Sequence, residues 1–192
     1  MSEESINKLI SIQGNIKKIS NIHNNKPQVI CVSKTFSINK IRPLLDYGHL
    51  HFGENKVQEA ENKWTEIKKE NKEIKLHMVG KLQSNKTKKA VEIFDYIHSL
   101  DSIKLANSLK KRELELKKKL FYFIQVNIGD EAQKAGILVK NTNNFLNYCK
   151  TELDLNVIGL MVLPPNDGNV EKYFKNISEL NFKLGLKHLS MG

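Results

Sequence analysis

The stretch LFYFIQV at residues 120–126 decides the fold, because it is the strongest strand pattern in the sequence. It is rich in aromatic and β-branched residues, which favour strands. A helical pattern over 102–117 precedes it, and a second helix that includes 145–150 follows it. The next strand patterns outward are 96–100 and 157–162, so strands and helices alternate on both sides of this stretch.

The same alternation continues toward both ends of the chain. Further strands are predicted at 29–32, 49–52 and 74–79, with another beginning at 186–189. Further helices are predicted at 4–22, from about 41 to 48, and at 55–70, 85–94 and 170–184. No long linker rich in Pro, Gly or Ser interrupts this order, so we expect one domain with a parallel sheet.

A doubly wound sheet and a (β/α) barrel both fit this order of elements. The first predicted strand is not followed by a G-x-G-x-x-G turn, which weakens the dinucleotide-binding version of the doubly wound fold. About seven successive strand–helix units favour the barrel. In a barrel, functional side chains are expected at the carboxyl ends of the strands.

Composition excludes several classes of protein. The chain has 192 residues, of which 40% are hydrophobic and 27% charged, as in globular proteins. No apolar run approaches the length of a transmembrane helix, and residues 1–10 carry Glu3 and Glu4 and lack the apolar region of a signal peptide. Cys31 and Cys149 form no C-x-x-C motif, so neither a disulfide framework nor a zinc site is expected. These features predict a soluble, cytoplasmic protein.

The formal net charge of +10 raises the question of nucleic-acid binding. Only Arg42 and Arg112 are arginine among the 31 basic residues. Proteins that read bases or hold phosphates favour arginine, whose planar group bonds two acceptors at once. The runs Lys88–Lys89 and 117–119 lie on predicted helices or at their ends, where solvated faces are expected. The lysine, asparagine and isoleucine content is what coding DNA rich in A and T would produce, so no nucleic-acid partner is expected.

Lys34 follows the first predicted strand in the sequence Val32-Ser33-Lys34-Thr35. It has the same parity as Ile30 and Val32, so it shares their face. If that face points into a barrel, the Lys34 ammonium emerges at the carboxyl-terminal mouth. Partial desolvation there would lower its pKa and make it a nucleophile able to form a Schiff base. The alternative is an ordinary surface lysine.

The second predicted strand runs into His51-Phe52-Gly53-Glu54-Asn55. Gly53 would allow a ligand to approach closely, and Asn55 could donate or accept a hydrogen bond at the mouth. Asn55 could instead cap the following helix. His49 and His51 share one face of this strand, but no nearby Cys or Asp completes a metal site, so no metal is expected.

Other strand ends also carry polar residues or glycine. His77 lies in His77-Met78-Val79-Gly80, and Ser190 follows the last predicted strand. Met161 lies near the end of the 157–162 strand, where a methionine most often fills the core.

Six segments together resemble one known family. They are VSKT at 32–35, HFGENKVQE at 51–59, HMVGKLQSNK at 77–86, NIGDEAQKAGI at 127–137, GLM at 159–161 and LSMG at 189–192. Their order and spread over the chain resemble the pyridoxal phosphate homeostasis proteins, which are stand-alone barrel relatives of the alanine racemase N-terminal domain.

The resemblance implies a (β/α)8 TIM-type barrel that holds pyridoxal 5′-phosphate (PLP) at the carboxyl ends of its strands. Lys34 matches the family lysine that forms the internal aldimine, and Asn55 matches the asparagine near the phenolic oxygen of the cofactor. His77 and Met161 match residues that line the ring, and Ser190 lies in the motif beside the phosphate. The family is regarded as carriers or regulators of the PLP pool, with PLP-dependent apoenzymes as recipients and without established turnover.

This sequence departs from the family pattern in two respects. Lys56 stands where the family often has an aromatic residue, and Lys81 where it often has proline. The family also continues past Ser-Met-Gly into another serine, a helix and a final strand with Arg-Ile-Gly. We therefore expect residues 1–192 to be a single PLP-binding barrel domain, truncated at the carboxyl end, that lacks the last strand and helix and binds PLP more weakly.

Two other functions are weighed against PLP homeostasis. An amino-acid racemase would use the same lysine and cofactor, but two-base racemisation needs a second acid–base group on the opposite face of the substrate. Alanine racemases supply it from a separate β-domain that has no counterpart here. A basic RNA-associated protein would be expected to interleave aromatic and basic residues, which this sequence does not do. The expectation is a non-enzymatic, monomeric PLP-binding protein.

Overall fold

The computed structural model describes residues 2–23, 26–129, 131 and 135–191. In this part of the chain, seven parallel strands form one curved sheet in the order β1-β2-β3-β4-β5-β7-β8, and an eighth, β6, pairs with β5 outside that path. The strands are β1 (Cys31–Val32), β2 (His51–Glu54), β3 (Lys75–Met78), β4 (Tyr96–Leu100), β5 (Phe121–Asn127), β6 (Ile137–Leu138), β7 (Val157–Val162) and β8 (His188–Met191).

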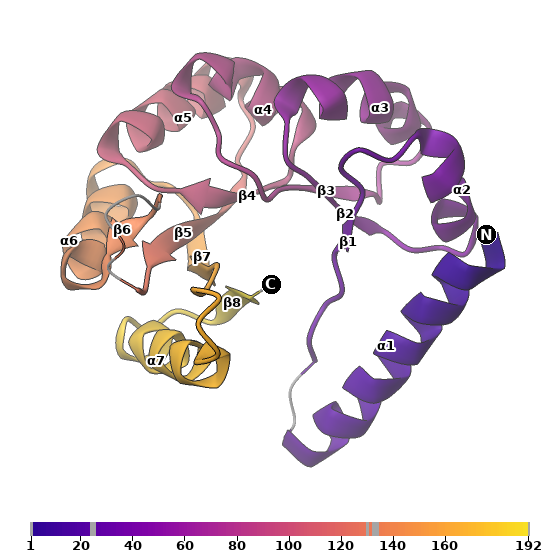
Figure 1. The fold of residues 1–192 in the computed structure, drawn as a ribbon. Helices are drawn as coiled ribbons and strands as arrows, with labels where there is room; N and C mark the ends of the chain where they lie inside the picture. The colour runs from indigo at the N-terminus through magenta and orange to yellow at the C-terminus, as the bar shows by residue number, and fades with distance from the viewer. Residues whose placement is uncertain (1, 24–25, 130, 132–134, 192) are drawn as a thin grey trace.

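All helices but the first lie between strands and cover the convex side of the sheet, whereas the first precedes β1 and contacts the second helix (Figure 1). The helices are α1 (Ser2–His23), α2 (Ile38–Asp46), α3 (Val57–Glu70), α4 (Thr87–Ile93), α5 (Ile103–Leu116), α6 (Thr142–Asn147) and α7 (Val170–Lys183). None of the described helices is long and apolar enough to cross a membrane.

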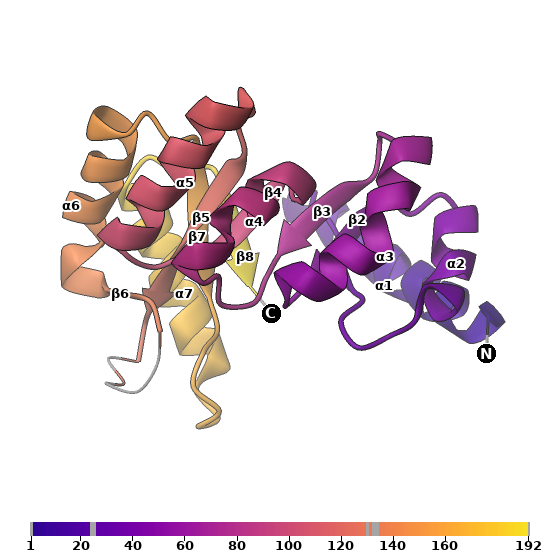
Figure 2. The ribbon, with the colours of Figure 1, turned by 90° about the horizontal axis from the view of Figure 1, so that it is seen from above.

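The sheet is open between its first and last strands. No pairing between β1 and β8 occurs among the described residues, and Figure 2 shows β2 and β3 with their helices on one side and β5, β7 and β8 on the other. Val32 on β1 is 47% exposed. The chain therefore forms the curled parallel sheet of a TIM-type barrel with an open side, which confirms the predicted fold class. Val32 is exposed because none of the described strands pairs with that side of β1.

The core lies between the sheet and the helices. Alternate residues of the strands face outward into it, among them Leu76, Ile97 and Ile124, and each is at most 1% exposed. Trp64 of α3 and Leu109 of α5 are buried in the same cluster. Fully burying a side chain of this size contributes about 1.5–3 kcal/mol relative to leaving it exposed. Because these outward positions serve the core, the inward positions of the strands are left for a site.

The predicted element boundaries hold best where a strand is central. β4 and β7 begin and end where the sequence predicts them. β2 begins two residues later than predicted, because it starts at the residue that pairs with the first residue of β3, His51 with Lys75. β1 has two residues instead of four, and the short β6 was missed because two residues carry no periodicity.

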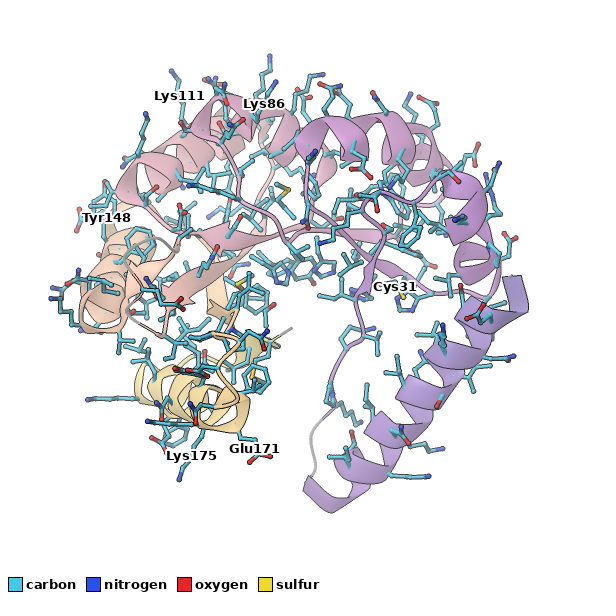
Figure 3. The ribbon with its side chains drawn as sticks, viewed as in Figure 1. Cys31, Lys86, Lys111, Tyr148, Glu171 and Lys175 are labelled. Carbon is cyan, nitrogen blue, oxygen red and sulfur yellow. The ribbon has the colours of Figure 1, made fainter. Side chains whose placement is uncertain are left out.

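Much of the lysine-rich surface is solvated. Figure 3 shows Lys86, Lys111 and Lys175 projecting outward from the elements that carry them. Lys88, Lys89, Lys117 and Lys119 are also exposed, as predicted. Lys118 is different, because its Nζ donates to the backbone oxygens of Glu92 and Phe94 at 3.1 and 2.8 Å. Burial, with the nearby Lys68 charge, lowers the pKa of Lys118 to about 8.

Candidate functional site

Lys34 lies in a turn directly after β1, at the carboxyl end of the sheet. The backbone N–H of Ser33 donates to the oxygen of Gly53 at 2.8 Å, so the β1–β2 ladder continues to the residue before Lys34. The Lys34 side chain is exposed, and no hydrogen bond or ion pair involves it in the described part of the chain. The sequence predicts partial desolvation of Lys34, and this prediction is wrong, because none of the described strands pairs with the adjoining side of β1.

Glu54, in the HFGEN motif, anchors the end of β2 to its neighbours. Its side chain is fully buried on the helix side of the sheet, where Oε1 accepts hydrogen bonds from Ser33 Oγ at 2.8 Å and Trp64 Nε1 at 2.9 Å. The strand that carries Lys34 is thereby tied to β2 and to α3. This carboxylate has a structural role that the sequence analysis missed.

Asn55 follows β2 and lies next to the turn of Lys34, because Val32 pairs with Gly53. It does not cap α3, whose N-cap residue is Lys56. Its backbone packs against Gly80, where a Cβ atom would lie only 2.5 Å from the Asn55 carbonyl oxygen. Gly80 is therefore required for the loop after β3 to pack against Asn55. Gly53, in contrast, leaves space that the side chains of Ile30, Val32 and Val79 fill, so a ligand role for Gly53 is not supported.

Three histidines and a serine form a continuous chain of polar contacts on the concave side of the sheet. His51 Nδ1 lies 3.0 Å from His77 Nε2, and His77 Nδ1 lies 2.9 Å from His98 Nε2. His98 Nδ1 lies 2.7 Å from Ser190 Oγ. These residues come from β2, β3, β4 and β8. Because β4 and β8 are not neighbours in the sheet, the last contact crosses the interior of the curled sheet.

Burial keeps the inner two histidines neutral. Desolvation, with the charges of His98, His51 and Lys68, lowers the pKa of His77 to about 2. Desolvation also lowers the pKa of His98 to about 4. A neutral imidazole has one donor and one acceptor nitrogen, so each ring can donate to one neighbour and accept from the other. Stacking fixes the ring planes, with Tyr96 at 4.3 Å from His77 and Phe123 at 4.5 Å from His98 between centroids.

Met161 and Ser190 lie side by side on the paired strands β7 and β8. Met161 is 4% exposed, and its register partner on the other side is Gln125 of β5. Gly159 makes this close pairing possible, because a Cβ atom there would lie 2.0 Å from the oxygen of His188. The glycine of the GLM motif is therefore explained by the close packing of β7 against β8.

The predicted site residues form two groups in the structure. Lys34 and Asn55 lie at the ends of β1 and β2, whereas His77 and Ser190 are joined through His98, with Met161 beside Ser190. The connecting residue, His98, was not singled out in the sequence. The sequence does contain a signal for His98. It lies in a predicted strand, next to the apolar Ile97 and therefore on the opposite face of the sheet.

Two cavities lie near the ends of the strands. One of about 320 Å³ lies at the carboxyl end of β5 and is lined by Gln125, Asn127, Gly129 and Leu163 among others. The NIGDEAQKAGI motif borders it, although residues 130 and 132–134 of that motif lie outside the described residues. The larger cavity, about 520 Å³, is lined by Lys68, Asp95 and Lys118 among others and lies at the opposite end of the strands. The smaller cavity and Lys34 thus both lie at the carboxyl end of the sheet, and the larger cavity lies at the other end.

Metal and disulfide chemistry find no support here. Within the described ranges, no three His, Cys, Asp or Glu side chains are grouped so that they could hold a metal ion. Cys31 and Cys149 are both free, as predicted, and burial raises the pKa values of their thiols to about 11 and 12.

The donor set suits an aldehyde cofactor that carries a phosphate. The Lys34 amine is exposed and has no hydrogen-bond or ion-pair partner among the described residues, so it is free to condense with a carbonyl carbon. The other predicted site residues are neutral: an amide on Asn55, an uncharged ring on His77, a thioether on Met161 and a hydroxyl on Ser190. None of them would repel a phosphate dianion, so the residues present fit PLP.

The fold and the position of the lysine define the class of protein. The family model of the alanine racemase N-terminal domain matches residues 8–190. The chain therefore belongs to this family of barrel proteins.

Curated relatives narrow the assignment. The pyridoxal phosphate homeostasis protein of Aquifex aeolicus is 33% identical over 177 residues, which are 88% of this chain and 77% of that protein. The protein of the same name from Buchnera aphidicola is 35% identical over 157 residues, covering 82% and 68% of the two chains. The chain belongs to the pyridoxal phosphate homeostasis protein family.

A solved relative has the same architecture. PipY of Synechococcus elongatus, whose structure contains PLP, superposes with a TM-score of 0.77 at 31% identity, covering 92% of this chain and 88% of PipY. An alanine racemase of Clostridium difficile superposes with a TM-score of 0.68 at 11% identity, and the matched part covers 50% of that chain. The second likeness shows a shared fold alone.

Proposed function

We propose that this chain binds PLP through a Schiff base with Lys34 and serves PLP homeostasis without turning over a substrate. The observation that carries the proposal is the Lys34 amine, which is exposed at the carboxyl end of β1, within the VSKT motif of its family, and has no partner in the part of the chain that the structure describes. Covalently bound PLP supplies an aldehyde-derived linkage and an electron-withdrawing ring. The protein supplies the amine and the groups that orient the ring.

The other site residues would hold the cofactor from two sides. We assign Asn55 to the phenolic oxygen, His77 and Met161 to the ring, and Ser190 to the region of the phosphate. Their positions on β2, β3, β7 and β8 support this assignment, because all four lie on or directly after strands of one sheet. Ser190 Oγ is already oriented by His98, which fixes where the hydroxyl lies.

The absence of turnover is part of the proposal. A second catalytic base would need a pKa near the working pH. The buried histidines of the site do not provide one, because the pKa values of His77 and His98 are lowered to about 2 and 4. Both rings therefore stay neutral and serve as hydrogen-bonding groups. This argument disfavours the racemase alternative.

The first experiment is an absorbance spectrum of the purified protein with added PLP, before and after reduction with borohydride. Peptide mapping of the reduced protein should place the pyridoxyl group on Lys34. Lys34→Ala should lose the absorbance band of the Schiff base. Lys56→Ala is the matched control, because Lys56 is an exposed lysine close to the same strand ends, and it should keep the band. An unchanged band in Lys34→Ala would refute the assignment.

The second experiment tests turnover and delivery of the cofactor. Incubation of the PLP-loaded protein with D- and L-amino acids, followed by chiral analysis, should show no racemisation that depends on Lys34. Racemisation at enzyme-like rates would instead support the alternative function. We also propose PLP-dependent apoenzymes as recipients, and the loaded protein should reactivate one faster than the same quantity of free PLP held in a solution of the Lys34→Ala variant.

A further inference from the structure

Thr35, the residue after Lys34, has a backbone conformation that a threonine rarely adopts. Its φ is +65°, in the left-handed region. That region disfavours side chains with a Cβ atom, and a β-branched residue there is a conformational outlier. Such a conformation persists only where the surrounding contacts hold it. The contacts that hold this turn therefore determine where the Lys34 side chain begins.

Both peptide groups beside Lys34 are held by side chains of α3. Glu59 Oε1 accepts a hydrogen bond from the backbone N–H of Thr35 at 2.6 Å. Lys63 Nζ donates to the backbone oxygen of Ser33 at 2.8 Å. The first contact fixes the peptide group after Lys34, and the second fixes the peptide group before it.

Glu59 and Lys63 also bind each other and the core of the sheet. They lie four residues apart on one face of α3, with Glu59 Oε1 3.1 Å from Lys63 Nζ. Lys63 makes a third contact, to the buried carboxylate of Glu54 at 2.8 Å. The three N–H bonds of the Lys63 ammonium thus have three acceptors.

The burial of this pair makes it more than a surface ion pair. The side chain of Lys63 is 8% exposed and that of Glu59 is 27% exposed. Partial burial acts to raise the pKa of Glu59, but hydrogen bonds from Lys63 and the Thr35 amide outweigh it and hold that pKa below its usual range. Glu59 is therefore ionised at neutral pH, and its bond to the Thr35 amide is charge-assisted.

We propose that Glu59 and Lys63, which we call the α3 clamp, are positioning residues that set the location and direction of Lys34 for its reaction with the PLP aldehyde. This inference rests on the proposed function, in which Lys34 is the residue that binds PLP. The α3 clamp touches only backbone atoms of the Lys34 turn, so it acts through Lys34 and takes no part in the chemistry.

The reaction itself explains why the position matters. The neutral Lys34 amine forms a bond to the aldehyde carbon, and the aldehyde oxygen leaves as water with two protons from the amine nitrogen. When other groups hold the rest of the cofactor, the reaction needs the amine at one place. A turn that samples other conformations moves Nζ away from the carbon and slows the condensation.

The first test measures the turn in the protein without cofactor. Hydrogen exchange at the Thr35 amide should become about ten- to a hundredfold faster in Glu59→Ala, because the amide loses a charged acceptor. Lys63→Met should raise the exchange in the same direction, since it removes the partner that orients Glu59. Glu66→Gln is the matched control, because it breaks the exposed Glu66–Lys69 pair of the same helix and should leave this amide unchanged.

The second test measures the reaction of Lys34. Glu59→Ala should form the Schiff base with PLP about tenfold more slowly than the unmodified protein, and Glu66→Gln should match the unmodified protein. Adding Thr35→Gly to Glu59→Ala should recover part of the rate, because glycine adopts the left-handed conformation without a steric penalty. Circular dichroism and thermal unfolding identify any variant that fails to fold, and Lys63→Met then replaces Glu59→Ala in both measurements.

The outcomes distinguish failure of the proposed function from failure of the proposed role of the α3 clamp. If Lys34→Ala retains the absorbance band, the proposed function fails, whereas the exchange measurement still reports on the turn. If Lys34→Ala loses the band but Glu59→Ala and Lys63→Met react and exchange like the unmodified protein, the α3 clamp is not a positioning device. Faster exchange with an unchanged rate of reaction also overturns the proposal, since the turn would then not control Lys34.

Discussion

Acidification should destabilise this protein through its buried histidines, above all His77 and His98. The folded-state pKa values of His77 and His98 are lowered to about 2 and 4, mainly by burial. In the unfolded chain a histidine titrates near its ordinary value, about 6.5. Between these values the unfolded chain binds protons that the folded protein does not. The free energy of unfolding is therefore highest above about pH 6.5 and falls as the pH decreases below it.

The size of this loss of stability follows from the difference between the folded-state and unfolded-state pKa values. A pH of about 5 is about 1.5 units below the pKa of a histidine in the unfolded chain, and each unit changes the free energy of unfolding by about 1.4 kcal/mol per histidine. Protonation of the unfolded chain at His77 and at His98 then lowers the free energy of unfolding by about 2 kcal/mol each, and by about 4 kcal/mol together. This is a large part of the stability of about 5–15 kcal/mol that is typical of a folded domain. Glu113, whose pKa burial raises, acts in the opposite direction, so a comparison of variants is needed.

The assay is denaturant unfolding at several pH values from about 7.5 to about 5. His98→Gln should be less stable at every pH, since it loses its stacking with Phe123, but it should lose clearly less stability over this range than the unmodified protein. His188→Gln is the control for the substitution itself, because His188 is exposed and lies outside the chain of rings. A loss below about 1 kcal/mol in the unmodified protein, or an equal loss in His98→Gln, would refute the reasoning.

Two further substitutions test the packing of the site and of the core. Gly80→Ala should lower the free energy of unfolding by about 1–3 kcal/mol and weaken PLP binding, because the added methyl group would lie 2.5 Å from the Asn55 carbonyl oxygen. Gly14→Ala, in open space on α1, should leave PLP binding unchanged and stabilise slightly, and equal effects of the two would contradict the contact. Glu113→Ala should lower the free energy of unfolding, measured with denaturant, by at least about 1–3 kcal/mol, because the buried Glu113 Oε1 accepts hydrogen bonds from the Leu120 amide and from Tyr122 Oη. A smaller loss would show that these two donors find other acceptors.

Local patterns predicted the elements whose surroundings are uniform. The strands at 96–100 and 157–162 are central in the sheet and occur where they were predicted. A central strand is paired on both sides, so its apolar residues are buried along its whole length and its pattern is complete. β1 lacks a partner on one side in the described structure, and only two of its four predicted residues form a strand.

For the site, the sequence found the residues but not their contacts. Lys34 and Asn55 were recognised because they directly follow strand patterns and lie in family motifs. The exposure of Lys34 was not foreseen, because it depends on which strand covers β1. The α3 clamp was not foreseen either, because whether Glu59 and Lys63 reach the Lys34 turn depends on how α3 packs against β1.

The sequence by itself determined the alternation of strands and helices apart from the short β6, and its family motifs identified the class of fold and the lysine proposed to bind PLP, because these depend on neighbours along the chain. The tertiary structure alone decided how distant polar residues meet. His77 and His98 are 21 residues apart, and His98 and Ser190 are 92 residues apart, yet each pair is in hydrogen-bonding contact. Such contacts depend on the register and curvature of the sheet. Those are set by the packing of every strand and helix together, and no local pattern encodes them.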